Sequence, residues 1–285
     1  MKKEQLEYAA ARYGTPLYIF DLDILKKQTD RLRKALGKET GLCYAMKANP
    51  FLTEQMAEQA DRIEVCSMGE FEICRSLGIP PEKLFISGVL KKKEDIYRIL
   101  EIYGEKCRYT VESVRQLHYF LEWSDTHMKT LRLYPRLTNG SQFGMDEETM
   151  RSIVSIVNMS PYLEIEGIHY FSGTQKRHIR QFRQELQMLD RFLQKIRDEW
   201  NVEIRHLEYG PGTAVPYFIG KEAETYTGDG LGELKEAIRS MEWNCDDRAG
   251  KGIRGRVRIL SDRDSGRKKE RRYAVLYCGR RESSD

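Results

Sequence analysis

The sequence predicts an α/β protein whose parallel strands form a TIM-like (β/α)8 barrel. Three observations lead to this fold class. Short apolar runs alternate with segments of helical period, and 285 residues are enough to bury one large core. Hydrophobic residues at 40% and charged residues at 32% are typical of a soluble protein. Strands separated by helices of this length are expected to pair in parallel through right-handed crossovers.

The expected elements follow one another from the amino terminus. Leu17 to Phe20 is expected to form a first strand, and Asp21 can cap a helix that ends at Gly37. Ser67 and Glu70 fit a capping box at the start of a later helix. Further strands, each followed by a helix, are expected at residues 41–46, 63–66, 84–87, 108–111, 131–137, 163–171 and 206–209. The seven strand–helix units after the first strand are one short of the eight that a barrel needs.

The eighth strand is doubtful because the composition changes after Trp243, where it should lie. Residues 245–285 hold 13 Lys and Arg against 7 Asp and Glu, and their few apolar residues are scattered. Such a segment has little apolar surface with which to cover one face of a strand. We therefore divide the chain into a barrel domain, residues 1–244, and a basic, poorly ordered tail, residues 245–285.

Several classes of function are disfavoured by what the sequence lacks. The six cysteines form no CxxC pair, so we expect neither a zinc site nor a disulfide framework. The basic tail has almost no interleaved aromatic residues and no nucleic-acid motif. No apolar run approaches the length of a membrane span, and Met1 to Lys3 does not lead into a signal segment. We expect a cytoplasmic protein that binds neither metal, nucleic acid nor membrane.

The most informative stretch is Tyr44-Ala45-Met46-Lys47-Ala48-Asn49, where a lysine ends a buried run. Pro50 disfavours helical backbone at Asn49, so Lys47 is expected where a strand meets a loop. Desolvation at a barrel mouth lowers the pKa of a lysine and frees its amine to attack an aldehyde. Lys47 is therefore a candidate Schiff-base residue, although a lysine at a strand end can also simply reach into water.

Two other stretches are expected at the same mouth. Glu208-Tyr209-Gly210-Pro211-Gly212-Thr213 follows the seventh barrel strand, where glycines let backbone N–H groups approach a phosphate. Gly167 to Gln175 ends the sixth strand with aromatic, hydroxyl and amide groups. Each stretch alone fits an ordinary turn or core packing. Together with Lys47 they supply an amine, a ring platform and a phosphate cradle, which are the requirements of pyridoxal phosphate.

Five motifs, in this order, resemble the barrel domain of the diaminopimelate and ornithine decarboxylases, which are fold-type III pyridoxal phosphate enzymes related to alanine racemase. The motifs are Tyr-Ala-Met-Lys-Ala-Asn, Cys-Ser-Met-Gly-Glu, Gln-Phe-Gly-Met-Asp, Gly-Ile-His-Tyr-Phe-Ser-Gly-Thr-Gln and Gly-Pro-Gly. The resemblance covers about residues 8 to 244, and the family's C-terminal β-domain is missing from the match. Residues 245–285 then read as a frame-disrupted remnant of the barrel end and of that β-domain.

The resemblance also implies roles for individual residues. Lys47 would bind the cofactor's aldehyde, and Glu64 with Arg132 would form an acid–arginine pair near it. The catalytic set it implies consists of Lys47, Glu64, Arg132 and His169. The residues implied to bind pyridoxal 5'-phosphate are Lys47, Phe171, Thr174, Gly210, Gly212 and Thr213. The family would be a homodimer.

Departures from the family pattern bear on the substrate. Phe171 stands where the family usually has a histidine that packs on the pyridine ring, and Gln142 stands where a lysine is common. These features look more like the branch that decarboxylates amino acids linked to a carrier protein. Arg248 aligns loosely with the carboxylate that meets the pyridine nitrogen, and an arginine there would not hold that nitrogen protonated.

The expected function is pyridoxal phosphate-dependent decarboxylation of an amino acid, as in lysine biosynthesis, or of an aminoacyl carrier protein. Two alternatives remain open. One is a non-catalytic pyridoxal phosphate-binding homeostasis protein, which also lacks a β-domain. The other is an alanine racemase-like isomerase, which Arg248 would suit and which would release no CO2.

Overall fold

The computed structural model describes residues 3–37, 40–88, 91–174, 176, 178–213, 230–241 and 256–261. The chain divides into two compact units, residues 1–31 with 264–285 and residues 32–263. The described part of the first unit contains helix α1 (Lys3–Tyr13) and most of helix α2 (Leu22–Leu36). Asp21 accepts a hydrogen bond from the Ile24 amide at 3.2 Å, so the expected cap at the start of α2 is confirmed.

The second unit alternates strands and helices, as expected. Its strands are β1 (Gly41–Ala45), β2 (Arg62–Val65), β3 (Leu84–Ile86), β4 (Arg108–Val111), β5 (Leu131–Leu137), β6 (Leu163–Ile165), β7 (Gly167–Phe171), β8 (His206–Gly210) and β9 (Arg256–Ser261). Its helices after α2 are α3 (Thr53–Gln59), α4 (Met68–Ser76), α5 (Lys93–Tyr103), α6 (Val114–His127), α7 (Glu147–Met159), α8 (Ile179–Trp200) and α9 (Gly230–Arg239). Short 3-10 turns lie at η1 (Met46–Ala48), η2 (Pro50–Leu52), η3 (Pro81–Lys83) and η4 (Gly104–Lys106).

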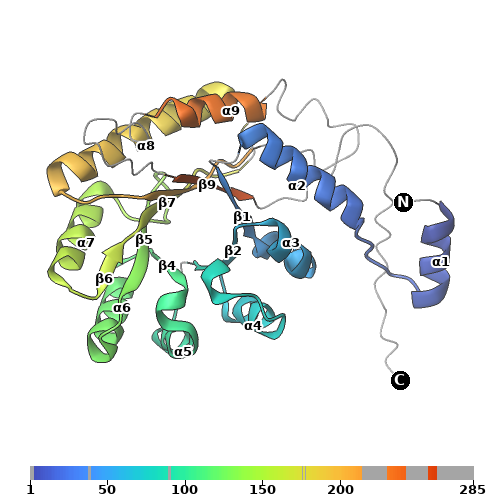
Figure 1. Cartoon of the computed structure of the whole chain (residues 1–285), viewed down its shortest axis with the longest axis horizontal. Coiled ribbons are helices and arrows are strands. Elements are labelled where there is room, and N and C mark those ends of the chain that lie inside the picture. Colours follow the sequence, from blue (N-terminus) through green and yellow to red (C-terminus); the bar gives the residue numbers. More distant parts are fainter. Residues whose placement is uncertain are drawn as a thin grey trace. The chain divides into compact units, whose positions relative to one another are not determined.

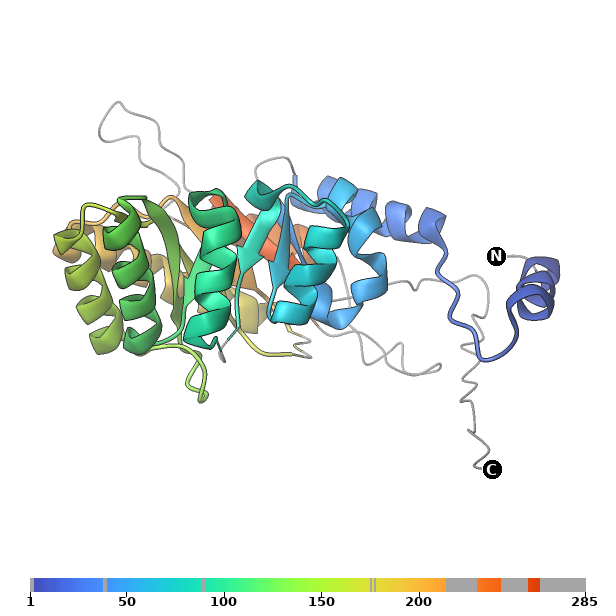
Figure 2. The same cartoon turned by 90° about the horizontal axis from the view of Figure 1, so that it is seen from below.

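The strands form a closed parallel barrel. The sheet runs β4-β3-β2-β1-β9-β8-β7-β5-β6, and an additional β4–β5 pairing joins its two sides into a ring, with β6 attached to β5 alone. Figure 1 shows the strands of this unit on the inside and helices α3 to α7 around them, and Figure 2 shows the same elements from the side. The predicted (β/α)8 fold class is confirmed.

The eighth barrel strand, which the sequence left in doubt, is β9. It pairs in parallel with both β1 and β8, with Arg258 opposite Gly41 on one side and Glu208 on the other. The strand that the composition left in doubt does form, at residues 256–261, so the sheet extends past residue 244. Backbone groups of two neighbouring strands supply the hydrogen bonds of this segment, so its mixed composition does not prevent pairing. Residues 245–255 and 262–285 lie outside the described residues.

Two other expectations need correction. Leu17–Phe20 is not a strand: the sheet begins at Gly41, and Tyr18 and Ile19 are exposed. An apolar run without a neighbouring strand cannot form the inter-strand backbone hydrogen bonds that define a β-strand. The single strand expected over residues 163–171 is divided into β6 and β7 at Glu166, whose carboxylate accepts hydrogen bonds from Arg108 and Tyr134.

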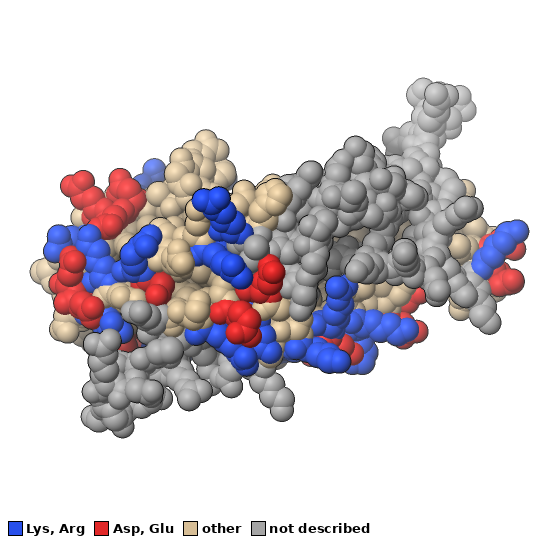
Figure 3. Space-filling view, turned by 90° about the horizontal axis from the view of Figure 1, so that it is seen from above, with Lys and Arg blue, Asp and Glu red and all other residues tan. Residues whose placement is uncertain are grey.

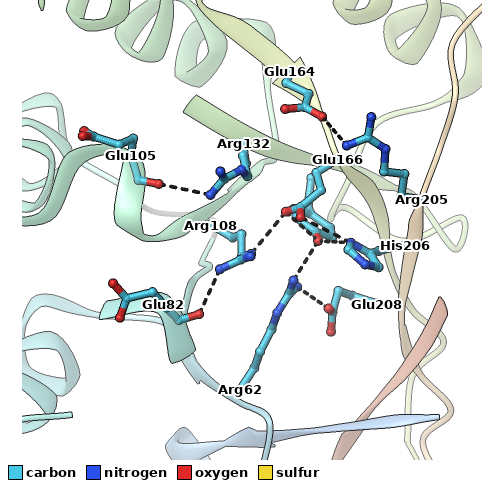
Figure 4. A network of polar contacts seen from close by, with 11 residues as sticks. Arg62, Glu82, Glu105, Arg108, Arg132, Glu164, Glu166, Arg205, His206 and Glu208 are labelled. Atoms are coloured by element: carbon cyan, nitrogen blue, oxygen red, sulfur yellow. Dashed lines mark hydrogen bonds and ion pairs between the residues drawn. The ribbon is translucent and has the colours of Figure 1, made fainter. Parts of the chain in front are cut away.

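A network of charged residues fills the amino-terminal end of the barrel (Figure 4). Arg62 begins β2 and donates a hydrogen bond of 2.5 Å to Glu208, and it also donates to the Tyr134 hydroxyl at 3.0 Å. Arg62 and Glu208 are almost fully buried. Burial raises the pKa of Glu166, but the positive charges of Arg108 and Arg62 outweigh that effect and hold it below its usual value. This end of the barrel is closed by paired charges, so the open site must be sought at the other end.

The outer surface carries both signs of charge. On the face shown in Figure 3, Lys and Arg are interspersed with Asp and Glu instead of being gathered into one large patch. Several of the exposed ion pairs join neighbouring helices, as between Lys93 of α5 and Glu122 of α6 at 2.7 Å. Among the helices that the structure describes, none combines the length and the hydropathy that a membrane span requires.

Candidate cofactor site at the barrel mouth

Lys47 lies where the sequence places it, just after the carboxyl end of β1. The buried run Leu42 to Met46 forms β1 and enters the turn η1, whose middle residue is Lys47. Asn49 and Pro50 then redirect the chain, and the Asn49 side chain accepts a hydrogen bond from the Phe51 amide. The Lys47 side chain is 46% exposed, so a small molecule in the mouth can reach its amine.

Glu64 is the residue that meets Lys47. The register of β1 and β2 pairs Ala45 with Glu64, and Lys47 follows Ala45 by two residues, in the turn η1. The Glu64 carboxylate is 3% exposed and its Oε2 lies 3.4 Å from the Lys47 Nζ. Within the described part of the chain this oxygen has no hydrogen-bond donor. The expected position of Glu64 beside the lysine is thus present in the structure.

Arg132 does not join this pair. It is the second residue of β5, and its guanidinium donates to the Glu105 carbonyl at 3.5 Å. Glu105 lies in the turn η4, which precedes β4. The arginine at the opposite end of the same strand is Arg136, which forms a buried ion pair of 2.7 Å with Glu112. Alternate residues of β5 share one face, so both arginines point the same way, but only Arg136 lies near the carboxyl end that forms the mouth. The expected Glu64–Arg132 pair is therefore wrong in position.

His169 and Phe171 lie on β7, two residues apart. The Phe171 ring faces Lys47, with the amine 5.5 Å from the ring centroid. His169 lies deeper, with an exposed fraction of 2%, and packs its ring edge to face with Phe85. Neither ring nitrogen of His169 has a hydrogen-bond partner in the described residues. Burial holds the pKa of His169 well below its usual value, and the charges of Arg136, Lys47 and Lys91 act in the same direction.

The loops after β7 and β8 interlock. The Ser172 amide donates to the Gly210 carbonyl and the Lys176 amide to the Gly212 carbonyl, each at 2.9 Å. Gly212 has a φ of +64°, and a Cβ there would lie only 1.9 Å from the Gly173 carbonyl oxygen. Only glycine fits this crossing. Gly173 itself faces open space, and Thr174 beside it is exposed.

Lys91 is a residue of the mouth that was not singled out by the sequence. Lys91 donates two hydrogen bonds of 2.8 Å to Thr110, and burial lowers its pKa to about 8 despite the nearby Glu112 carboxylate. Glu70 accepts a 2.6 Å hydrogen bond from the Cys66 amide, while Ser67 caps α4 as expected. Lys91 could have been predicted from its position shortly after the strand at residues 84–86, since residues that follow barrel strands line the mouth.

These residues fit pyridoxal phosphate. Open space lies at Gly173 of the glycine crossing, an aromatic ring stands beside a reachable amine, and a buried carboxylate lies against that amine. No three His, Cys, Asp or Glu side chains converge as metal ligands do, among the residues described. The mouth thus brings together a reachable lysine amine, a buried carboxylate, an aromatic ring and two glycine-containing loops.

Comparison with known proteins agrees. Residues 22–262 match the family described as the pyridoxal binding domain of pyridoxal-dependent decarboxylases. The chain is 25% identical over 272 residues to a diaminopimelate decarboxylase of Aquifex aeolicus, covering 90% of this chain and 64% of that protein. It is 27% identical over 243 residues to an L-glutamyl-[BtrI acyl-carrier protein] decarboxylase of Niallia circulans, covering 78% and 56%.

Solved structures show the same fold. A diaminopimelate decarboxylase of M. jannaschii superposes with a TM-score of 0.75 at 23% identity, covering 89% of this chain and 62% of that one. The chain thus spans less than two thirds of the length of these relatives.

Proposed function

Since the chain belongs to the family of pyridoxal-binding domains of the pyridoxal-dependent decarboxylases, we propose that it binds pyridoxal 5'-phosphate through Lys47 and takes part in the decarboxylation of an amino acid. The observation that carries this proposal is the Lys47 amine, reachable from solvent and 3.4 Å from a buried carboxylate. Glycine-lined loops stand at the same mouth. When bound, the cofactor supplies an electron sink for the charge left at Cα as CO2 departs.

The residues of this chain divide the remaining work. Glu64 Oε2 holds a proton on Lys47 Nζ until the amine is needed as a base or nucleophile. Phe171 offers a flat apolar face next to that amine, which favours ring packing and excludes water. The backbone around Gly173 and Gly212 accommodates the phosphate, together with the hydroxyls of Thr174 and Thr213.

The substrate we propose is a free diamino acid such as diaminopimelate, or an amino acid carried on a protein. Both kinds of substrate appear in the names of its relatives. The Gln-Phe-Gly-Met-Asp loop, which resembles the branch with carrier-linked substrates, contributes Phe143, whose half-exposed ring lies 5.5 Å from the Arg136 guanidinium. The proposal also includes that the protein forms a homodimer and acts in the cytoplasm.

Borohydride reduction in the presence of pyridoxal phosphate, followed by peptide mapping, tests the cofactor site. We expect the label on Lys47 in the wild-type chain and in Lys91→Met, and none in Lys47→Ala. Lys91 is the matched control, because it is a second lysine of the mouth with a pKa lowered by burial. A label on Lys91 in the wild-type chain would overturn the assignment.

Product analysis then separates the possible reactions. The wild-type chain, shown by the first test to bind pyridoxal phosphate, is incubated in turn with diaminopimelate, ornithine, lysine and carrier-bound glutamate. CO2 and amine products are then measured. Release of CO2 supports the decarboxylase. Formation of the D-enantiomer without CO2 would indicate an isomerase, and cofactor attachment without turnover of any substrate would indicate a carrier of the cofactor.

A further inference from the structure

Glu185 stands at the centre of a cluster beneath the two interlocked loops. It is a residue of α8, and its carboxylate accepts hydrogen bonds from donors on three other segments. The Ser172 hydroxyl lies 2.6 Å from Oε2 and 2.7 Å from Oε1, and the Tyr209 hydroxyl lies 2.8 Å from Oε2. The Lys176 ammonium contacts Oε1. One carboxylate thus ties together the end of β7, the loop that follows it, and β8.

The cluster is largely withdrawn from water. The side chains of Glu185 and Lys176 are 18% and 12% exposed, and Tyr209 is fully buried. Burial raises the pKa of Tyr209, so its hydroxyl keeps the proton that it donates. Charge-assisted hydrogen bonds in such surroundings are stronger than those at the surface. The cluster is therefore suited to holding its segments in one arrangement.

The same segments form the proposed phosphate cradle. Gly212 passes under the Gly173 carbonyl with no room for a side chain, and the Lys176 amide is bound to the Gly212 carbonyl. Ser172 has one hydroxyl proton, which it donates in a hydrogen bond to Glu185. Ser172 consequently anchors the loop from behind and leaves the anion to backbone amides and threonine hydroxyls.

The charges of the cluster are balanced. A lone buried carboxylate near the cradle would repel a phosphate dianion, but the ammonium of Lys176 neutralises Glu185. Replacing only one of the two residues leaves the other charge without its partner. Variants that change the charge of the cluster can therefore be compared with variants that remove its hydrogen bonds, which separates the two contributions to phosphate binding.

We infer that Glu185 is a positioning residue for the phosphate group: through Ser172, Lys176 and Tyr209 it holds the β7 and β8 loops in the geometry that lets the Gly173–Gly212 crossing bind an anion. This inference rests on the proposed function, because it concerns the phosphate end of the same cofactor. It assigns Glu185 no contact with the cofactor itself.

The test compares pyridoxal 5'-phosphate with pyridoxal, which lacks the phosphate. Binding of both to Lys47 is measured by absorbance for the wild-type chain, Glu185→Ala, Glu185→Gln and the matched control Glu199→Ala, an exposed position of the same helix. We expect Glu185→Ala to weaken pyridoxal 5'-phosphate about tenfold, the effect of losing a hydrogen bond to a charged group, and to leave pyridoxal within about twofold. Glu185→Gln should fall between, because it keeps hydrogen-bond acceptors for Ser172 and Tyr209 but removes the charge.

A merely structural role predicts a different pattern. If Glu185→Ala weakened both ligands equally, or neither, the inference would be wrong. Amide exchange of the peptides that contain Ser172 and Gly212, measured without any cofactor, tests the anchoring by itself: we expect at least about tenfold faster exchange in Glu185→Ala. Unchanged exchange would refute the inference even if the wild-type chain bound neither ligand, an outcome that would refute the proposed function separately.

Discussion

The Glu64 carboxylate lies 3.4 Å from the Lys47 amine, and the two groups differ sharply in exposure, at 3% against 46% of their side chains. They are brought together by the parallel register of β1 and β2. A buried carboxylate beside an amine favours its ammonium form. Glu64 is therefore placed to set the pH at which Lys47 becomes a nucleophile.

Replacing this carboxylate should shift the pH dependence of cofactor attachment. In Glu64→Gln the ammonium of Lys47 loses its negative partner, so its pKa falls relative to the wild-type chain and more amine is free at a given pH. We expect the midpoint of the rate of borohydride-trappable attachment to move to lower pH. Glu58→Gln, at an exposed position of α3, is the control. A midpoint equal to that of the control would contradict this role.

His169 should make stability depend on pH in the weakly acidic range. Its folded-state pKa lies well below 6.5, so below that pH the unfolded chain binds a proton that the folded chain does not. The free energy of unfolding should therefore fall as the pH drops below about 6.5, by up to about 1.4 kcal/mol per pH unit. In His169→Phe, which cannot take up a proton, this part of the slope should disappear.

Urea unfolding at pH 7.0, 6.0 and 5.5 measures this slope. His118→Gln serves as the control, because His118 is exposed on α6. Equal slopes for His169→Phe and the wild-type chain would show that another group is responsible for the acid sensitivity.

The sequence predicts the position of Lys47 well because a buried run and a following proline define a strand end locally. The resemblance assigned Arg132 to the mouth, although Arg132 and Arg136 share one face of β5 and Arg136 lies nearer the carboxyl end of the strand. β9 was left in doubt because its partners, β1 and β8, lie far away in the sequence. Glu185 gave no local signal at all, because its three donors come from other segments.

Gly212 should tolerate no side chain. An alanine there combines a φ of +64° with a Cβ only 1.9 Å from the Gly173 oxygen, so one of the two loops must move. Gly140 has a φ of +87° with nothing within 4 Å of its Cβ position, and Gly140→Ala thus isolates the backbone strain. We expect about 1 kcal/mol of destabilisation for Gly140→Ala and about 2 to 4 kcal/mol for Gly212→Ala, with loss of pyridoxal 5'-phosphate binding only in the latter. Equal effects in urea unfolding and cofactor titration would mean that the crossing is not tight in solution.

The buried Arg62–Glu208 pair should matter far more to stability than an exposed pair of the same network. Arg62 and Glu208 are 3% and 0% exposed and lie 2.5 Å apart, whereas Arg205 and Glu164 lie 3.1 Å apart at 50% and 38% exposure. Arg62→Met removes the arginine that pairs with the buried Glu208 carboxylate, so we expect a loss of about 3 to 5 kcal/mol in the free energy of unfolding.

The exposed pair supplies the control for this experiment. Arg205→Met should lower the free energy of unfolding by less than about 1 kcal/mol, because water screens the exposed charges. The double variant Arg62→Met with Glu208→Met should recover most of the stability lost in Arg62→Met, since no buried charge is then left uncompensated. Urea unfolding of the four chains decides the matter. If Arg62→Met were no worse than Arg205→Met, or if the double variant were less stable than Arg62→Met, the amino-terminal network would not be held by this pair, and the Tyr134 hydroxyl that Arg62 also contacts would be the next group to test.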